Sequence, residues 1–520
     1  MCALRPLALV LALVLAAPIA GASPSRSDAP LLARVRAQLP SVERAARAAG
    51  SGSPEAVQAH YEAARDLEEG VRAVAAVSAD CRDLRREALA FARAHVTQAE
   101  GFDRRQPPLV NASRRRAAAT KVRLERALVR CRNGTPGAPG RGPNGAPTVR
   151  VLSPRPGGIS FGPMRLETLV PSGASWAVIA VGKGGPGCTA SGARRIDVTA
   201  TDRLRVDLPL RPGRHDIAVW FCAQTKGSSP RVVGTGTVNG VWVLPASARS
   251  AATGRSPDRA LSNRLRGVAA GFDGYSAVWY HDLLKGRTAA WNADARFPAA
   301  STVKLAVLVA ALRTLGPSPE QGRFGYDLKA MTGWSSNLAT NRLLGRIGRG
   351  SAAAGSRAAE AVLKELGARS STFTGEYRVG TSITRPRAEP PRVSSRVTTA
   401  RDLGRILYLI HAGATGRKSA LTALKLERRR AQLALGMLLA SEPYADNVGL
   451  VRGSVARSVP VAQKNGWLAD ARHTAAIVYV TVGPQLAILL TYRPRLTLAE
   501  AAAYAGEVLQ VVLDRGTRRP

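Results

Sequence analysis

The sequence predicts a multidomain protein with an N-terminal α-helical bundle, a central β-sandwich and a C-terminal α/β domain. Its 520 residues exceed what one hydrophobic core usually covers. The spacing of apolar residues changes along the chain from three or four, which is typical of helices, to two, which is typical of strands, and then to a mixture of both. Two polar segments, 133–147 and 246–258, separate the three regions.

The first 22 residues have the features of a secretory signal peptide. Arg5 precedes an apolar run from Leu7 to Ala17, and Ala20-Gly21-Ala22 provides a small-residue cleavage site. The run is too short for a good membrane span, and Cys2, which precedes it, is badly placed for a lipid anchor. We therefore expect a secreted, extracytoplasmic protein without a transmembrane segment after signal removal, with cell-wall association as a further option.

Residues 23–132 form the predicted helical domain. Stretches such as PEAVQAHYEAARDLEEGVRAVAAV and LRREALAFARAHV have apolar residues three and four apart, and Pro54 stands at the start of the first. This pattern predicts a small helical bundle or a long helical hairpin, used for docking, dimerisation or spacing. His60 and His95 lack the paired spacing of metal ligands, so we expect them to be surface or packing residues.

Residues 133–147, NGTPGAPGRGPNGAP, form a Gly/Pro-rich linker that cannot hold a helix. From 148 to 245 the period is two, because RLRVDLPL, HDIAVWFCA and TVNGVWVL alternate apolar and polar residues between turns. Several short strands in about a hundred residues predict an immunoglobulin-like or fibronectin-like sandwich. Such a module spaces or binds, and it shows no catalytic motif.

Four cysteines remain in the mature chain, and an even number in an exported protein permits disulfides. Four cysteines allow three pairings, of which the domain layout favours Cys81–Cys131 and Cys188–Cys222. The alternative is four buried free thiols.

The chain is strongly basic, with a net charge of +39. Outside the membrane such a charge suits anionic cell-wall polymers or membrane surfaces. Nucleic acid is disfavoured as a partner, because aromatic residues are only 5% of the chain and no recognition motif is present. An arginine-rich composition without any specific partner is the alternative interpretation.

The stretch FPAASTVKLAVLVAAL, residues 297–312, carries the first chemical signal. Its apolar spacing predicts a buried helix, with Ser301 at the helix start and Lys304 one turn along on the same face. The first turn of a helix presents unpaired N–H groups that stabilise negative charge near the serine oxygen. A lysine in an apolar helix is a candidate base for the serine, since burial disfavours its charged form.

Two later segments complete a pattern. Ser335 and Asn337 precede another apolar helical run, and Lys464-Asn465-Gly466 opens a predicted strand. The order Ser-x-x-Lys, Ser-x-Asn, Lys-x-Gly resembles the penicillin-recognising serine enzymes, which are the class A β-lactamases and the low-molecular-weight penicillin-binding proteins. Asn341 matches the later asparagine of the family's second motif, and the resemblance covers residues 259–516.

The rest of that region fits the α/β plan that the resemblance implies. The pattern predicts a helix over 261–271, then two strands, SAVWYHDL and RTAAWN. Near the end, TAAIVYV and LAILLTY flank a turn at Gly483-Pro484-Gln485 and predict a buried hairpin. The terminal helix begins at Thr497, with Glu500 placed for a capping box.

The resemblance implies a role for each matching residue. Ser301 would be the acylated nucleophile, Lys304 its base, and Ser335 the proton relay to the leaving nitrogen. Lys464 would attract the substrate carboxylate and polarise Ser335. The remaining substrate-binding positions would be Asn337, Asn465, Gly466 and Trp467, with the backbone N–H groups of Ser301 and Trp467 forming the oxyanion hole. No cofactor or metal is implied.

The sequence also departs from the family pattern. Ser336 replaces an aspartate, Asn465 replaces a hydroxyl residue, and Ser301 and Ser335 are only 34 residues apart. Class A enzymes carry a Glu-x-x-x-Asn whose glutamate activates the deacylating water, and no such pattern lies between Glu376 and Thr399. Glu376 and Glu389 are the two glutamates of that loop, and each is a candidate base or a solvated carboxylate.

Three functions therefore stay open. The first is a β-lactamase-type serine hydrolase that takes part in β-lactam catabolism and antibiotic resistance. The second is a D-alanyl-D-alanine peptidase that acts on peptidoglycan stem peptides, with basic accessory domains docked on the wall. The third is a non-catalytic wall-binding protein with a degenerate enzyme domain. No Gly-x-Ser-x-Gly elbow or phosphate loop supports another enzyme class.

Overall fold

The computed structural model describes residues 28–76, 78–133, 148–182, 187–189, 194–224, 228–249, 252, 255–377, 379, 396–441 and 448–513. The predicted signal peptide, most of the predicted linker at 133–147 and Glu389 lie outside these residues. The chain divides into two compact units, 1–140 and 141–520, which are described separately. None of the helices in the described part of the chain is both long enough and apolar enough to cross a bilayer.

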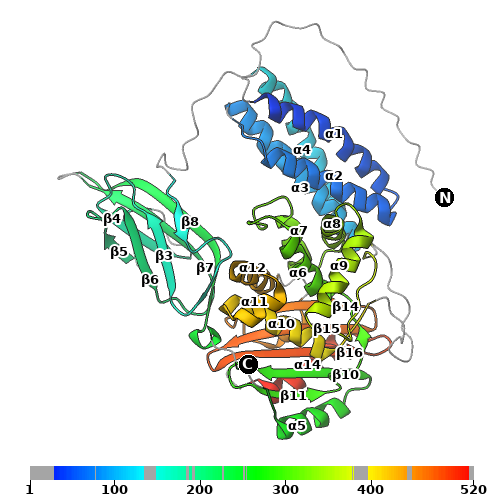
Figure 1. Cartoon of the computed structure of the whole chain (residues 1–520). Coiled ribbons are helices and arrows are strands. Elements are labelled where there is room, and N and C mark those ends of the chain that lie inside the picture. The colour runs from blue at the N-terminus through cyan, green and yellow to red at the C-terminus, as the bar shows by residue number, and fades with distance from the viewer. Residues whose placement is uncertain are drawn as a thin grey trace. The chain divides into compact units, whose positions relative to one another are not determined.

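The first unit is a helical bundle and not a single hairpin (Figure 1). Ser53 and Ser78 cap the second and third helices, each by accepting a hydrogen bond from a backbone N–H three residues on. A disulfide between Cys81 and Cys131 joins the third helix to the fourth, as the domain layout predicted. The helices are α1 (Ala29–Ala49), α2 (Pro54–Arg72), α3 (Ala79–Asp103) and α4 (Pro107–Asn133).

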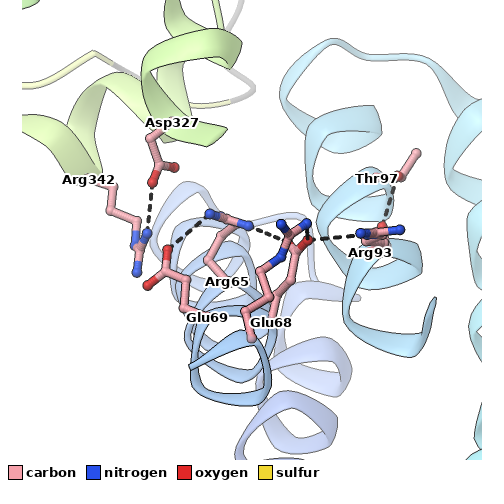
Figure 2. Close-up of polar contacts among 8 residues, drawn as sticks. Arg65, Glu68, Glu69, Arg93, Thr97, Asp327 and Arg342 are labelled. Atoms are coloured by element: carbon pink, nitrogen blue, oxygen red, sulfur yellow. Dashed lines mark hydrogen bonds and ion pairs between the residues drawn. The ribbon is translucent and has the colours of Figure 1, made fainter. Parts of the chain in front are cut away.

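A cluster of charged side chains lies between helices α2 and α3 (Figure 2). Glu68 is almost fully buried and pairs with Arg65, with Arg72 at 2.6 Å and with Arg93 at 3.2 Å. Burial alone would raise the pKa of Glu68, but the three arginines lower it overall. We call these four residues the Glu68 cluster.

Two buried histidines of the same unit contact each other, which their positions in the sequence did not predict. His60 on α2 and His95 on α3 are buried, and His60 Nε2 is 2.9 Å from His95 Nδ1. Burial, together with the neighbouring His95, lowers the pKa of His60 to about 3. Burial lowers the pKa of His95 to about 4. These histidines are packing residues, as predicted, but they pack on each other.

The second unit begins with two β-sheets that share one hydrophobic core. One sheet has the order β1-β3-β6 and the other β2-β8-β7-β4-β5. A disulfide between Cys188 and Cys222 ties a loop to β7, which confirms the second predicted pairing. The strands are β1 (Val151–Ser153), β2 (Ile159–Phe161), β3 (Met164–Leu169), β4 (Trp176–Val181), β5 (Arg194–Asp197), β6 (Arg203–Leu208), β7 (Gly213–Ala223) and β8 (Arg231–Leu244). The immunoglobulin-like type of this sandwich stays a prediction.

One end of the sandwich packs into the core of the α/β region. Phe161, Leu244 and Ala248 belong to the same buried cluster as the helices of that region, and the Phe161 ring lies edge-on to His411 at 6.3 Å. The predicted linker at 246–258 starts with a 3-10 helix, η1 (Ala246–Arg249), and Arg249 donates to the Phe161 carbonyl at 2.8 Å. The sandwich and the α/β region are therefore in direct contact through apolar side chains.

The α/β region is built on a six-stranded sheet of order β14-β15-β16-β10-β11-β9, antiparallel except for the β11–β9 pair. Strand β10 sends Val278 and Tyr280 to one face, under helices α5 and α14, and Ala277 and Trp279 to the other, under the remaining helices (Figure 1). The strands are β9 (Ser256–Pro257), β10 (Tyr275–Asp282), β11 (Arg287–Trp291), β14 (Val461–Trp467), β15 (Ala471–Val480) and β16 (Gly483–Tyr492), with a small pair β12 (Phe297–Pro298) and β13 (Val397–Thr398).

Several predicted elements of this region are present. Helix α5 is capped by Asp258, strands β15 and β16 form the buried hairpin, and Thr497 and Glu500 form the capping box of α14. The helices are α5 (Arg259–Ala270), α6 (Lys304–Thr314), α7 (Gly325–Gly333), α8 (Asn337–Ile347), α9 (Ala352–Glu365), α10 (Ala400–Thr415), α11 (Lys418–Leu424), α12 (Arg428–Leu439), α13 (Leu450–Ser454) and α14 (Leu498–Val512).

Candidate active site

Ser301 lies in a tight turn directly before helix α6, three residues ahead of the first helical residue. Backbone bonds of the i to i+3 type, such as Lys304 N to Ser301 O at 3.2 Å, wind the turn into the helix. The residue before the serine, Ala300, has a φ of 49°, in the left-handed region that residues with a Cβ rarely adopt. The serine is thus held at the helix entrance, as predicted, by a strained turn.

Lys304 is 1% exposed and reaches helix α8 across the site. Its Nζ donates to the Ser335 carbonyl at 2.6 Å and to Asn337 Oδ1 at 2.8 Å. The Tyr377 ring centroid lies 4.2 Å from the same nitrogen. The structure therefore brings the first two predicted motifs together around one buried amine.

Lys464 approaches Ser335 from the sheet. It is 1% exposed, and its Nζ donates to Ser335 Oγ at 2.8 Å and to the Asn465 carbonyl at 2.9 Å. Burial lowers the pKa of Lys464 to about 7. Ser335 itself has a left-handed φ of 64°. Its hydroxyl lies at the end of Lys464 and its carbonyl at the end of Lys304, so one residue connects the two lysines.

The packing around Gly466 explains why the third motif has a glycine at this position. A Cβ at this position would lie 2.9 Å from the Thr302 nitrogen and 3.0 Å from the Ala299 oxygen, closer than side chains tolerate. Strand β14 can therefore lie against the turn that holds Ser301 only because residue 466 has no side chain. This contact places the Trp467 end of the strand beside the turn that carries Ser301.

Two details of the third motif differ from the prediction. Lys464-Asn465-Gly466 lies in the second half of β14 and not at its start, because pairing with β15 already begins at Val461. The Asn465 side chain, predicted to touch substrate, is 2% exposed, and its Oδ1 accepts a hydrogen bond from Thr474 Oγ1 at 3.0 Å. Successive strand residues face opposite sides, so Asn465 is directed away from the side of Lys464.

Helix α8 accounts for the second motif. Ser336, which replaces the usual aspartate, caps the helix by accepting from the Ala339 N–H at 3.1 Å. Serine caps helices about as well as aspartate, so this departure preserves the local fold. Further along the helix, Asn341 holds Tyr377 from both sides, since its Nδ2 donates to the Tyr377 carbonyl at 2.7 Å and its Oδ1 accepts from the Tyr377 N–H at 2.8 Å.

The loop that should supply a deacylating base presents a different side chain to Lys304. Glu376 is exposed, and the neighbouring Tyr377, which is buried, faces the lysine. Glu389 lies outside the described residues. Tyr377 was not among the residues predicted from the sequence, in which only its position directly after Glu376 pointed near it. Within the described residues, no cluster of three or more potential metal ligands was found.

A serine in a strained turn, two buried lysines and a hydroxyl between them form a site suited to acyl transfer. Residues 260–318 and 327–515 match the model of a family described as the β-lactamase enzyme family. The C-terminal region of this chain therefore belongs to the β-lactamase-like serine hydrolases.

Solved structures similar to this chain include PBP-A, with 17% identity and a TM-score of 0.39, covering 49% of this chain and 97% of that chain. A β-lactamase from Sphaerobacter thermophilus DSM 20745 has 18% identity and a TM-score of 0.39, covering 50% of this chain and 97% of that one. A β-lactamase from Desulfarculus baarsii DSM 2075 has 21% identity and a TM-score of 0.38, covering 49% and 98%. No curated protein matches the chain.

Proposed function

We propose that this protein is a secreted serine hydrolase that is acylated at Ser301 by β-lactams and hydrolyses the lactam amide, in β-lactam catabolism and antibiotic resistance. One observation carries the proposal. Lys304 and Lys464, 160 positions apart in the chain, are both buried and both donate to Ser335, which matches the three-motif arrangement of the family. Two buried lysines on one serine are costly to stability, and an active site explains them best.

In the proposed acylation, Ser301 Oγ attacks the lactam carbonyl carbon while its proton passes to neutral Lys304. The backbone N–H groups of Ser301 and Trp467 stabilise the negative charge that develops on the carbonyl oxygen. The C–N bond then breaks, Ser335 gives its proton to the leaving nitrogen, and Lys304 returns to its neutral form by passing the proton from Ser301 on to Ser335. Lys464, which donates to Ser335 Oγ at 2.8 Å, keeps that hydroxyl oriented and attracts the substrate carboxylate. Asn337 binds the amide side chain of the substrate, and water later hydrolyses the ester.

The test is to mix the full-length protein with nitrocefin and to follow both colour change and intact mass, with Ser301→Ala as the matched control. Sustained turnover that the control lacks would support a β-lactamase. A protein that gains no adduct and produces no colour would refute acylation by this class of compound and favour the non-catalytic wall-binding alternative.

The second candidate is a D-alanyl-D-alanine peptidase of the penicillin-binding type, and one observation favours it. Among the described residues of this loop, the aromatic Tyr377 faces Lys304, whereas the side chain of Glu376 is exposed. An acyl-enzyme without a nearby base for water would persist. A stoichiometric, stable adduct on Ser301 without turnover, together with release of D-alanine from a stem-peptide mimic, would support this candidate over the first.

A further inference from the structure

Tyr377 touches three parts of the site at once. Its hydroxyl donates to the Ala300 carbonyl at 3.1 Å, its ring covers Lys304 Nζ at 4.2 Å, and its backbone is held on both sides by Asn341. Burial raises the pKa of Tyr377, so the hydroxyl keeps its proton and remains a donor. The side chain is 8% exposed, which leaves it few other conformations.

The hydroxyl acts on the turn that holds the nucleophile. Ala300 adopts a left-handed φ of 49°, a conformation that is unfavourable for alanine by about 1 kcal/mol and persists only where neighbours hold it. The Tyr377 hydroxyl bonds the carbonyl of this residue, which is the peptide unit directly before Ser301. Because that peptide unit carries the Ser301 N–H, the bond also fixes one donor of the proposed oxyanion hole.

The ring acts on the lysine. The face of an aromatic ring attracts a cation, and a buried ring over an amine also occupies the space that water would fill. Arg396 covers the Tyr377 ring as well, at 4.0 Å, and its Nη2 donates to the carbonyls of Gly375 and Glu376. Residues 375–377 are thus held by hydrogen bonds from two directions, from Asn341 to the Tyr377 backbone and from Arg396 to the two preceding carbonyls.

We propose that Tyr377 is a positioning residue that sets both the rate at which Ser301 is acylated and the lifetime of the acyl-enzyme. Its hydroxyl holds the strained turn in the reactive arrangement, and its ring keeps water away from Lys304. Hydrolysis of the ester requires water to add to the ester carbonyl, the bond to Ser301 Oγ to break, and Oγ to recover a proton. The ring slows the first of these steps. This inference rests on the proposed acylation of Ser301.

The test compares three full-length variants with the natural protein, using nitrocefin and benzylpenicillin, stopped-flow acylation and intact mass over time. Tyr377→Phe keeps the ring and removes the hydroxyl. Tyr377→Leu removes both. Tyr504→Phe is the control, because Tyr504 is also a buried tyrosine, whose hydroxyl bonds Ser276 at 2.9 Å in the other core of the same region. Thermal unfolding of each variant is measured in parallel.

We expect Tyr377→Phe to lower the second-order acylation rate roughly tenfold, as the loss of one hydrogen bond would, with an unchanged adduct lifetime. Tyr377→Leu should lower the rate similarly and shorten the lifetime of the adduct. Tyr504→Phe should change neither. Acylation of Tyr377→Phe at the natural rate would overturn this inference, and so would an adduct on Tyr377→Leu that lasts as long as that of the natural protein. Either result would leave the proposed function standing.

Two further outcomes distinguish a failure of this inference from a failure of the proposed function. A natural protein that forms no adduct would overturn the proposed function and the role of Tyr377 with it. If Tyr377→Leu fails to fold, Tyr377→Phe and its control still decide the role of the hydroxyl. A merely structural tyrosine would lower the melting temperature without separating the acylation rate from the adduct lifetime.

Discussion

The Glu68 cluster of the helical unit and the buried lysines of the candidate active site, Lys304 and Lys464, stabilise buried charge in opposite ways. Glu68 is surrounded by three arginines, which lower its pKa although burial alone would raise it. Lys464 instead donates to a hydroxyl and a backbone carbonyl, and burial lowers its pKa to about 7. The first arrangement neutralises a charge inside the protein. The second holds a cation among neutral oxygens, which is the arrangement an anionic substrate group would complete.

The largest expected effect comes from removing the Lys464 amine of the candidate active site. Lys464→Met should lower kcat/KM for a β-lactam by about a thousandfold, because Ser335 loses its donor and the substrate carboxylate its partner. The free energy of unfolding should stay the same or rise, since an apolar side chain replaces a buried amine. Steady-state kinetics and urea unfolding measure the two quantities. A variant that loses stability in proportion to activity would show that Lys464 is structural.

Glu68→Gln should give the reverse pattern. It leaves Arg65 buried with only part of its compensating charge, because Glu69 at 3.0 Å remains. We expect the free energy of unfolding to fall by about 3 kcal/mol, which is typical of a broken buried pair, and acylation of Ser301 to be unaffected. Circular dichroism in urea and the nitrocefin assay provide the measurements. Unchanged stability would mean that the cluster is solvated in solution and that the comparison fails.

The pH dependence of kcat/KM tests whether the charge on Lys464 contributes to substrate binding. Lys464 has a pKa of about 7 and is charged below it, so an anionic substrate should bind more weakly as the pH rises. For a carboxylate-bearing β-lactam we expect kcat/KM to fall about tenfold between pH 7 and pH 8.5, since kcat/KM reports the free enzyme. Lys464→Arg, which stays charged, should flatten this fall. A natural profile that rises over the same range would contradict the proposed role.

The smallest effect concerns the two histidines of the helical unit. Their pKa values, about 3 for His60 and about 4 for His95, lie below the ordinary 6.5, so the unfolded chain binds protons that the folded chain excludes. Stability is therefore complete above pH 6.5 and decreases as the pH falls toward 4. Between pH 8 and pH 6 we expect the free energy of unfolding to drop by about 1.6 kcal/mol from this pair.

The measurement is urea unfolding of the full chain at several pH values. The second unit contributes its own acid sensitivity, because burial also lowers the pKa values of His281, His411 and His473. The double variant His60→Gln, His95→Gln therefore serves as the control. In this variant the free energy of unfolding should lose only the part of its pH dependence that comes from the helical unit. An identical pH dependence in both proteins would show that His60 and His95 do not contribute to it.

Much of the C-terminal fold could be predicted, because its signals are local in the sequence. The capping box at Thr497 and Glu500 needs two residues three apart, and the hairpin of β15 and β16 needs a turn between two apolar runs. The three motifs around Ser301, Ser335 and Lys464 were predicted to meet only through the family resemblance. Their spacing alone says nothing about how a helix, a turn and a strand are brought together.

The remaining features depend on which side chain a loop directs inward. Glu376 and Tyr377 are adjacent, and the glutamate was the natural candidate because it can act as a base. The structure buries the tyrosine, since Asn341 holds its backbone and its ring has more apolar surface to remove from water. His60 and His95 likewise meet across two helices, and helical spacing within either one could not reveal this contact.

The shared core between the sandwich and the hydrolase region has a consequence for how this protein can be divided. Phe161, Leu244 and Ala248 are covered by the hydrolase, and they in turn cover part of its helices. A fragment that begins at residue 259 would carry an uncovered apolar surface, which favours aggregation. A shortened chain that keeps the hydrolase region soluble should therefore begin before residue 148, so that it includes the sandwich as well.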